Sequence, residues 1–76
     1  MPMPMSRAWL EAECLRVTRK QLGCSGTQAV TIRRLHPKGS GPNWEPQQFR
    51  PPLDKVAEHY ARRALAELSE MYAWSD

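Results

Sequence analysis

The chain has 76 residues, a formal net charge of +3, two cysteines, and no apolar run near the ~20 residues that a membrane helix needs. A chain this short forms one domain and buries only about 60% of its unfolded surface, so a deep interdomain cleft is excluded. Two cysteines are too few for a disulfide framework, and the start of the chain does not read as a secretory signal. The protein is therefore expected to be cytoplasmic, without a membrane partner.

Positive charge is concentrated in the middle of the chain. Residues 1–22 carry four basic and two acidic side chains, residues 23–52 carry four and one, and residues 53–76 carry three and five. A basic central segment favours an acidic partner or nucleic acid, although a charge of this size also fits an ordinary soluble surface.

The N-terminal part is predicted to be a tail followed by a helix. Residues 1–5 alternate methionine and proline and are expected to be a disordered tail, with residues 6–76 forming the single domain. The helix is predicted over residues 7–22, because Ser6 suits its N-cap and Gly23 its C-cap.

One face of this helix is expected to lie in the core. Leu10, Cys14 and Val17 recur at helical spacing. Trp9 falls outside that stripe, on a charged face. It is expected either to pack against the tail or the last helix, or to await a partner.

The best strand covers residues 28–36, where β-branched residues are concentrated. Val30 and Ile32 share the face that is expected to be buried, and Arg34 continues that face toward the following loop. Arg33 has the opposite parity, so the two adjacent arginines should lie on opposite faces of the strand.

The return strand is predicted over residues 43–50, after the turn residues "PKGSGP". Pro46 cannot donate a hydrogen bond, so this must be an edge strand or carry a bulge. Trp44 and Phe49 have opposite parity, and only a bulge between them would bring both to the core.

The last helix is the strongest prediction and covers residues 53–74. Its apolar residues form one continuous stripe, and Glu58 and Arg62 form an i, i+4 pair on the polar side. The end of this helix extends beyond a short hairpin, so Met71, Tyr72 and Trp74 are expected to pack on the first helix or on a second chain.

The predicted fold class is α+β, with the order α-β-β-α. A two-stranded antiparallel hairpin is only marginally stable alone, so both helices should pack on one of its faces. Dimerisation through the strand edges or the last helix would help so small a core.

The segment "VTIRRLHPKGSGPNWE" and the long helix after "RPPL" resemble small uncharacterised bacterial proteins, over roughly residues 30–70. This resemblance implies no activity. The element order also looks like a shortened double-stranded-RNA-binding domain. However, the last helix begins "LDKVAEH", without that family's lysine-rich motif, so no residue role is carried over.

Metal and catalytic chemistry find little support in the sequence. The zinc-ligand types are spaced C-x9-C-x11-H-x22-H, from Cys14 through Cys24 and His36 to His59, without the close pairs that zinc sites use. No nucleophile, base and orienting residue can be placed together. The protein is therefore expected not to be an enzyme, and to hold no metal or cofactor.

The leading hypothesis is a binding protein whose basic hairpin contacts nucleic acid or an acidic protein. Arginine and lysine can pair with phosphate, and an aromatic residue can stack on a base. The candidate contacts are Arg33, Arg34, His36, Lys38, Trp44 and Arg50, with Arg16 and Lys20 extending the surface. The alternative is that the arginines only protect an edge strand and that Trp44 covers the core.

A second hypothesis is a homo-oligomeric interaction module built on the last helix. Tyrosine, tryptophan and arginine are the residues that interfaces favour. The candidate interface residues are Trp9, Tyr60, Met71, Tyr72 and Trp74.

Overall fold

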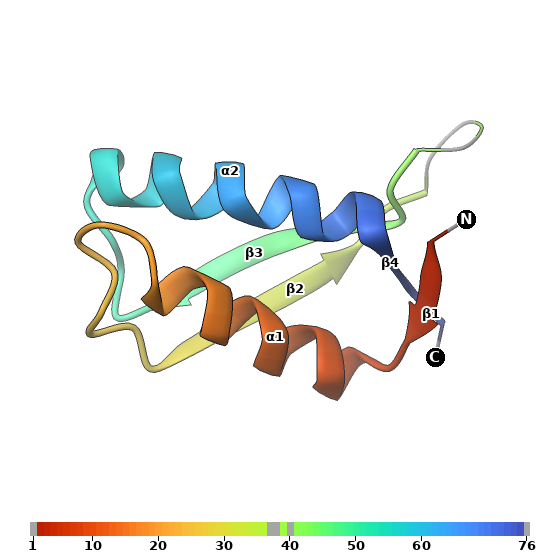
Figure 1. Ribbon diagram of the computed structural model, residues 1–76, viewed down its shortest axis with the longest axis horizontal. Helices are drawn as coiled ribbons and strands as arrows, with labels where there is room; N and C mark the ends of the chain where they lie inside the picture. Colours follow the sequence, from red (N-terminus) through yellow and green to blue (C-terminus); the bar gives the residue numbers. More distant parts are fainter. Residues whose placement is uncertain (1, 37–38, 40, 76) are drawn as a thin grey trace.

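The computed structural model describes residues 2–36, 39 and 41–75. Its elements, in chain order, are β1 (Met3–Met5), α1 (Arg7–Arg19), β2 (Ala29–Arg34), β3 (Trp44–Arg50), α2 (Lys55–Met71) and β4 (Tyr72–Trp74). The two helices cover the β2–β3 hairpin, and a small sheet of β1 and β4 closes one end of the molecule (Figure 1). The α+β class and the central order α1-β2-β3-α2 are confirmed.

The helix α1 begins where the sequence predicts and ends earlier. The Ser6 hydroxyl accepts a hydrogen bond from the Trp9 N–H at 3.2 Å, which caps the first turn. At the other end, the Lys20 N–H donates to the Val17 carbonyl at 3.2 Å, and this tighter turn ends the helix at Arg19. Gly23, with φ +80°, therefore serves the following turn and is not the helix cap.

A β-bulge in the hairpin brings both large aromatic residues of β3 to the core. The pairing register shifts between Thr31 and Ile32, and Gln47 on β3 is left without a partner residue on β2. The extra residue reverses the side-chain parity along β3, so Trp44 is 0% exposed and Phe49 is 3% exposed. The predicted bulge is confirmed.

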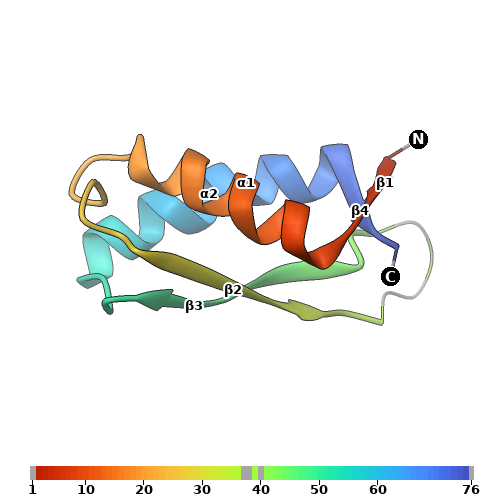
Figure 2. The same ribbon diagram turned by 90° about the horizontal axis from the view of Figure 1, so that it is seen from below.

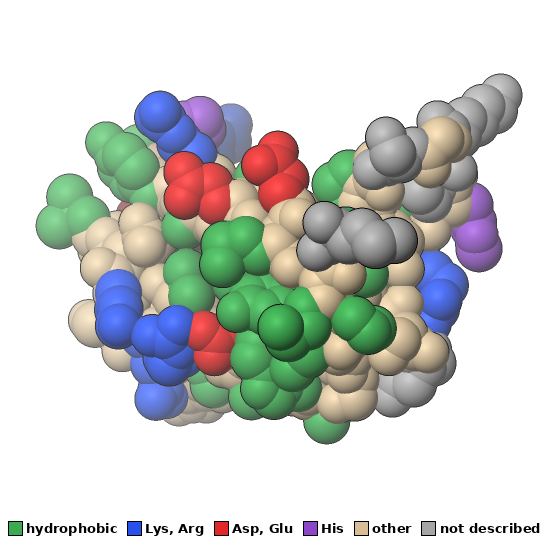
Figure 3. Space-filling model, turned by 45° about the vertical axis from the view of Figure 1, so that its right-hand side comes forward, with side chains coloured by type: hydrophobic (Ala, Val, Ile, Leu, Met, Phe, Trp, Pro, Cys, Tyr) green, Lys and Arg blue, Asp and Glu red, His purple; other side chains and the backbone are tan. Residues whose placement is uncertain are grey.

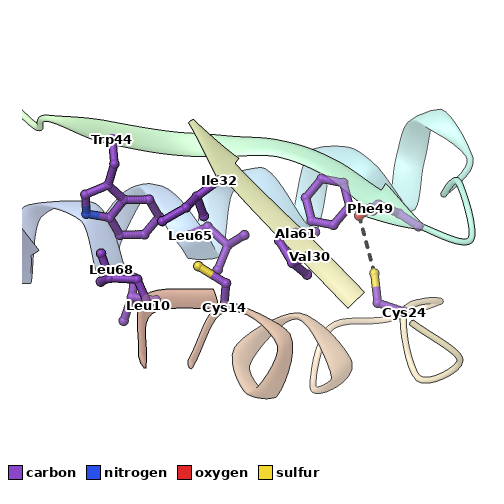
Figure 4. Close-up of a cluster of buried hydrophobic side chains, with 11 residues drawn as sticks. Leu10, Cys14, Cys24, Val30, Ile32, Trp44, Phe49, Ala61, Leu65 and Leu68 are labelled. Carbon is purple, nitrogen blue, oxygen red and sulfur yellow. Dashed lines mark hydrogen bonds between the residues drawn. The ribbon is translucent and has the colours of Figure 1, made fainter. Parts of the chain in front are cut away.

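The core lies between the hairpin and the two helices. Figure 4 shows side chains from both layers pointing toward one another: Leu10, Cys14, Val30, Ile32, Trp44, Phe49, Ala61, Leu65 and Leu68. Ala57 and Ala61 are also buried on α2. Because their side chains are small, α2 can lie close to the hairpin.

Both ends of the chain differ from the prediction. The last helix ends at Met71, and Tyr72–Trp74 form β4, which pairs in parallel with β1. Residues 3–5 are therefore a strand, and the expected disordered tail is wrong for them. The Ser75 N–H donates to the Met5 carbonyl at 3.0 Å, which extends this pairing.

Side chains fix β4 to the hairpin along its other edge. The Asn43 amide group donates to the Trp74 carbonyl at 2.8 Å and accepts from the Trp74 N–H at 2.9 Å. The Trp44 indole N–H donates to the Tyr72 carbonyl at 2.9 Å. These hydrogen bonds satisfy backbone groups of Tyr72 and Trp74 that would otherwise bond within a longer helix. The apolar periodicity does not reveal such bonds, so it predicts a last helix that is too long.

Side chains of the helices also occupy the two outer edges of the hairpin. On β2, the Ile32 N–H donates to a carboxylate oxygen of Glu11 at 3.2 Å. On β3, Arg62 donates to the Pro46 carbonyl at 2.9 Å, and Pro46 has no N–H. A second chain pairing with either edge, as the sequence suggested for a dimer, would have to displace these groups.

Candidate nucleic-acid interface

The helices leave one face of the hairpin uncovered (Figure 2). Side chains alternate between the two faces of a strand, and Val30 and Ile32 face the core. Their neighbours on β2, and the residues of β3 that pair with those neighbours, therefore point away from the core. We name this surface the outer face; its residues are Ala29, Thr31, Arg33, Glu45, Gln48 and Arg50. All six are half-buried or exposed.

Arg33 lies near one end of the outer face. It pairs with Glu45 directly across the ladder, and its side chain remains 59% exposed. An exposed pair of this kind contributes little to stability. A guanidinium has five N–H donors, more than one carboxylate can accept, so Arg33 can bind a second acceptor while it contacts Glu45.

Arg50 lies at the other end of the outer face. It is exposed and sits opposite Ala29 in the ladder. Ala29 and Arg33 are four positions apart on β2, which places the two arginine positions about 13 Å apart at about 3.3 Å per residue. Both cations therefore project from one surface that no helix covers.

Arg34 belongs to a different surface, as its parity predicted. Its guanidinium carbon lies 4.3 Å from the centroid of the Trp74 ring, and that of Arg7 lies 5.8 Å from the same ring. Three residues from distant parts of the chain thus form a cation–π cluster beside the small sheet.

His36, just beyond β2, is exposed. The remaining hairpin candidate, Lys38, lies outside the described residues.

Trp44 cannot stack on a nucleic-acid base in this structure, so the prediction of such a contact is wrong. Its side chain is fully buried, and its indole N–H is bonded to the Tyr72 carbonyl. The bulge explains the difference, because it turns this position toward the core. The alternative stated from the sequence, that Trp44 covers the core, describes its role.

The predicted contacts on α1 do not share the outer face. Arg16 and Lys20 are exposed, but α1 packs on the opposite side of the hairpin. Arg16 donates to the carboxylate of Glu13 and thereby lowers the pKa of that glutamate. These two cations therefore cannot extend a surface centred on Arg33 and Arg50.

Two of the predicted interface aromatics contact each other within the chain. The ring centroids of Trp9 and Tyr72 are 4.7 Å apart, and both residues are half-buried, as is Trp74. Trp9 thus packs against the end of the chain. Tyr60 is 42% exposed and Met71 is 56% exposed.

The two cysteines are structural residues of the core. Both are free thiols with no exposed surface, and burial raises the pKa of Cys14 to about 12 and also raises the pKa of Cys24. The Cys24 thiol donates to the Ala57 carbonyl at 3.5 Å (Figure 4). Thiols held in this protonated state are poor nucleophiles and poor metal ligands. Within the described ranges, no three His, Cys, Asp or Glu side chains gather in a metal-binding arrangement.

The sequence-based interpretation missed two polar members of the outer face, Thr31 and Gln48. They lie opposite each other, and the Thr31 hydroxyl donates to the Gln48 carbonyl at 3.4 Å. Counting parity backward from Phe49 would have placed Gln48 on this face. No local sequence pattern indicates that Arg7 contacts Trp74, because these residues come from opposite ends of the chain.

No protein-family model, curated protein or solved structure matches the chain. Within the part of the chain that is described, no helix has both the length and the hydrophobicity to cross a bilayer. The case for a function therefore depends on the surfaces of this molecule alone.

Proposed function

We propose that the protein is a non-enzymatic module that binds nucleic acid through the outer face of its hairpin. The observation that carries this proposal is that Arg33 and Arg50 project from one uncovered surface of a two-stranded ribbon. Guanidinium groups bind phosphate through paired hydrogen bonds, and rigid strands hold both groups in fixed positions.

The charge of the outer face predicts modest, salt-sensitive binding. It carries two arginines and one glutamate, and the charge of the whole chain adds a weak positive field. Each of the two arginines that binds a phosphate would contribute about −0.9 to the slope of the logarithm of the association constant against the logarithm of salt concentration, so the slope should be no steeper than about −1.8.

The proposal predicts that Arg33→Ala combined with Arg50→Ala abolishes binding to a labelled mixed pool of DNA and RNA at low salt. Fluorescence anisotropy measures the binding, and urea unfolding checks that the variant is folded. A matched control, Lys55→Ala with Arg63→Ala, removes two exposed cations from α2 and should retain most of the affinity. If the wild type binds only acidic proteins, or if both double variants lose affinity equally, the proposal is wrong.

A second candidate function is self-association, favoured by the apolar surface at the end of the molecule. Met3 is 59% exposed, and it pairs with Tyr72, the neighbour of the exposed Met71. Figure 3 brings this end forward and shows hydrophobic side chains gathered on it. Exposed apolar groups of this kind often mark contact surfaces.

Self-association predicts that the molar mass from light scattering rises with protein concentration, and that Met71→Glu abolishes the rise. Val56→Glu, at an exposed apolar position elsewhere on α2, is the matched control and should leave the rise intact. A wild-type chain that stays monomeric at millimolar concentration removes this candidate.

A further inference from the structure

We propose that the nucleic acid is B-form duplex DNA and that the hairpin enters its major groove, with the outer face against the base edges. This inference rests on the proposed function and specifies its ligand. It depends on three properties of the outer face: the chemistry of its side chains, its dimensions, and the absence of aromatic residues among its six members.

The side chains of the outer face are those that read base edges. Arginine can form two hydrogen bonds with guanine, glutamine can form two with adenine, and threonine can contact either a polar edge or the thymine methyl group. Arg33, Gln48 and Arg50 are exposed, and Thr31 lies between them on the ribbon. A phosphate oxygen can accept from the amide N–H of a glutamine but leaves its carbonyl unused, whereas the edge of adenine uses both groups.

The carboxylate of Glu45 points to the same conclusion. It lies on the outer face beside Arg33, where it would repel a phosphate of the backbone. A carboxylate can, however, accept a hydrogen bond from the amino group of cytosine in the major groove. Its position therefore fits contact with bases better than contact with phosphates alone.

The dimensions of the ribbon fit the major groove. Two paired strands lie about 4.8 Å apart, and the groove is about 12 Å wide, which leaves room for side chains. β2 has six residues and β3 has seven, so the ribbon is about 20 Å long. Both helices lie on the other side of the hairpin (Figure 2), so they do not obstruct its approach.

The other forms of nucleic acid fit the outer face less well. Proteins that bind single strands stack bases on exposed aromatic rings, but Trp44 and Phe49 of β3 face the core and no outer-face residue is aromatic. Duplex RNA has a deep and narrow major groove that side chains cannot read. B-form DNA is the form whose groove admits a two-stranded ribbon.

The experiment compares one sequence as duplex DNA, single-stranded DNA and duplex RNA, at equal salt. We expect duplex DNA to bind at least tenfold more tightly than either other form. Methyl green, which occupies the major groove, should displace the protein, and netropsin, which occupies the minor groove, should not.

Two single variants test base reading directly. Gln48→Ala should reduce the preference for the best duplex over a scrambled duplex by about tenfold, the contribution of one paired contact. Gln21→Ala, at a glutamine just after the end of α1 whose amide donates to the Val17 carbonyl, is the matched control and should leave this preference unchanged.

The outcomes separate the two proposals. Tighter binding to single strands or duplex RNA, displacement by netropsin, or an unchanged preference in Gln48→Ala overturns the major-groove inference while the proposed function stands. Failure to bind any of the three nucleic acids overturns both.

Discussion

At the scale of single residues, polar side chains complete the hydrogen bonding of the strand edges. Glu11 of α1 accepts from the Ile32 N–H on one edge of the hairpin, and Arg62 of α2 donates to the Pro46 carbonyl on the other. The marginal stability of a lone hairpin predicted that both helices pack on it. It did not indicate which polar residues reach the strands, because these contacts join segments that are distant in sequence.

The edge role of Glu11 predicts that Glu11→Ala lowers the free energy of unfolding by about 1–2 kcal/mol, because it leaves a partly buried N–H without its acceptor. Glu13→Ala is the matched control on the same helix. It breaks only a surface ion pair with Arg16 and should cost less than about 1 kcal/mol. Urea unfolding measures both variants, and equal losses would contradict the role given to Glu11.

At the scale of the elements, the hairpin was predictable and the small sheet was not. The parities of Trp44 and Phe49 indicated the bulge, since both are too large and apolar to leave exposed. The strands β1 and β4 have three residues each and pair across the whole chain, so no local pattern predicts them. The apolar periodicity instead predicted that the last helix continues through the residues that form β4.

The alternating prolines of the N-terminal segment make sense once the pairing is known. The Met5 carbonyl accepts from the Ser75 N–H, so it faces β4, and Pro4 has the alternate orientation. The missing N–H of Pro4 therefore falls on the outer edge of β1, where no hydrogen bond is lost. Proline at this position also hinders a further strand from pairing with β1.

The attachment of β4 through Asn43 predicts that Asn43→Ala lowers the free energy of unfolding by about 1–3 kcal/mol, because two hydrogen bonds to Trp74 are lost. Amide hydrogen exchange at Trp74 should become faster. Asn43→Asp keeps the acceptor for the Trp74 N–H but loses the donor to the Trp74 carbonyl, so it should retain only part of the protection of this amide. Unchanged exchange in Asn43→Ala would show that β4 is held by other contacts.

At the scale of the whole molecule, the chain is compact without a second copy. Its radius of gyration is 11.9 Å, close to the about 11.4 Å expected for a single domain of this length. The outer edges of the hairpin and of β1 are occupied by side chains or proline. An edge-to-edge dimer, which the sequence suggested as a help to so small a core, would have to displace these groups.

The layered arrangement also determines which predicted contacts can act together. Sequence parity correctly separated Arg33 from Arg34, and the structure adds Arg50 to the surface of Arg33. Arg16 and Lys20 were grouped with them by charge alone, but α1 lies in the other layer. Charge in a sequence indicates a class of partner, and only the fold shows which charges share a face.

The most direct test of the outer face as the binding surface is an NMR titration of the labelled protein with a duplex oligonucleotide at low salt. Amide shifts should concentrate in β2 and β3, with Thr31, Arg33, Gln48 and Arg50 most affected, while the exposed residues of α2 stay unchanged. Shifts concentrated on α1 or α2, with the hairpin unaffected, would contradict the outer face as the site of nucleic-acid binding.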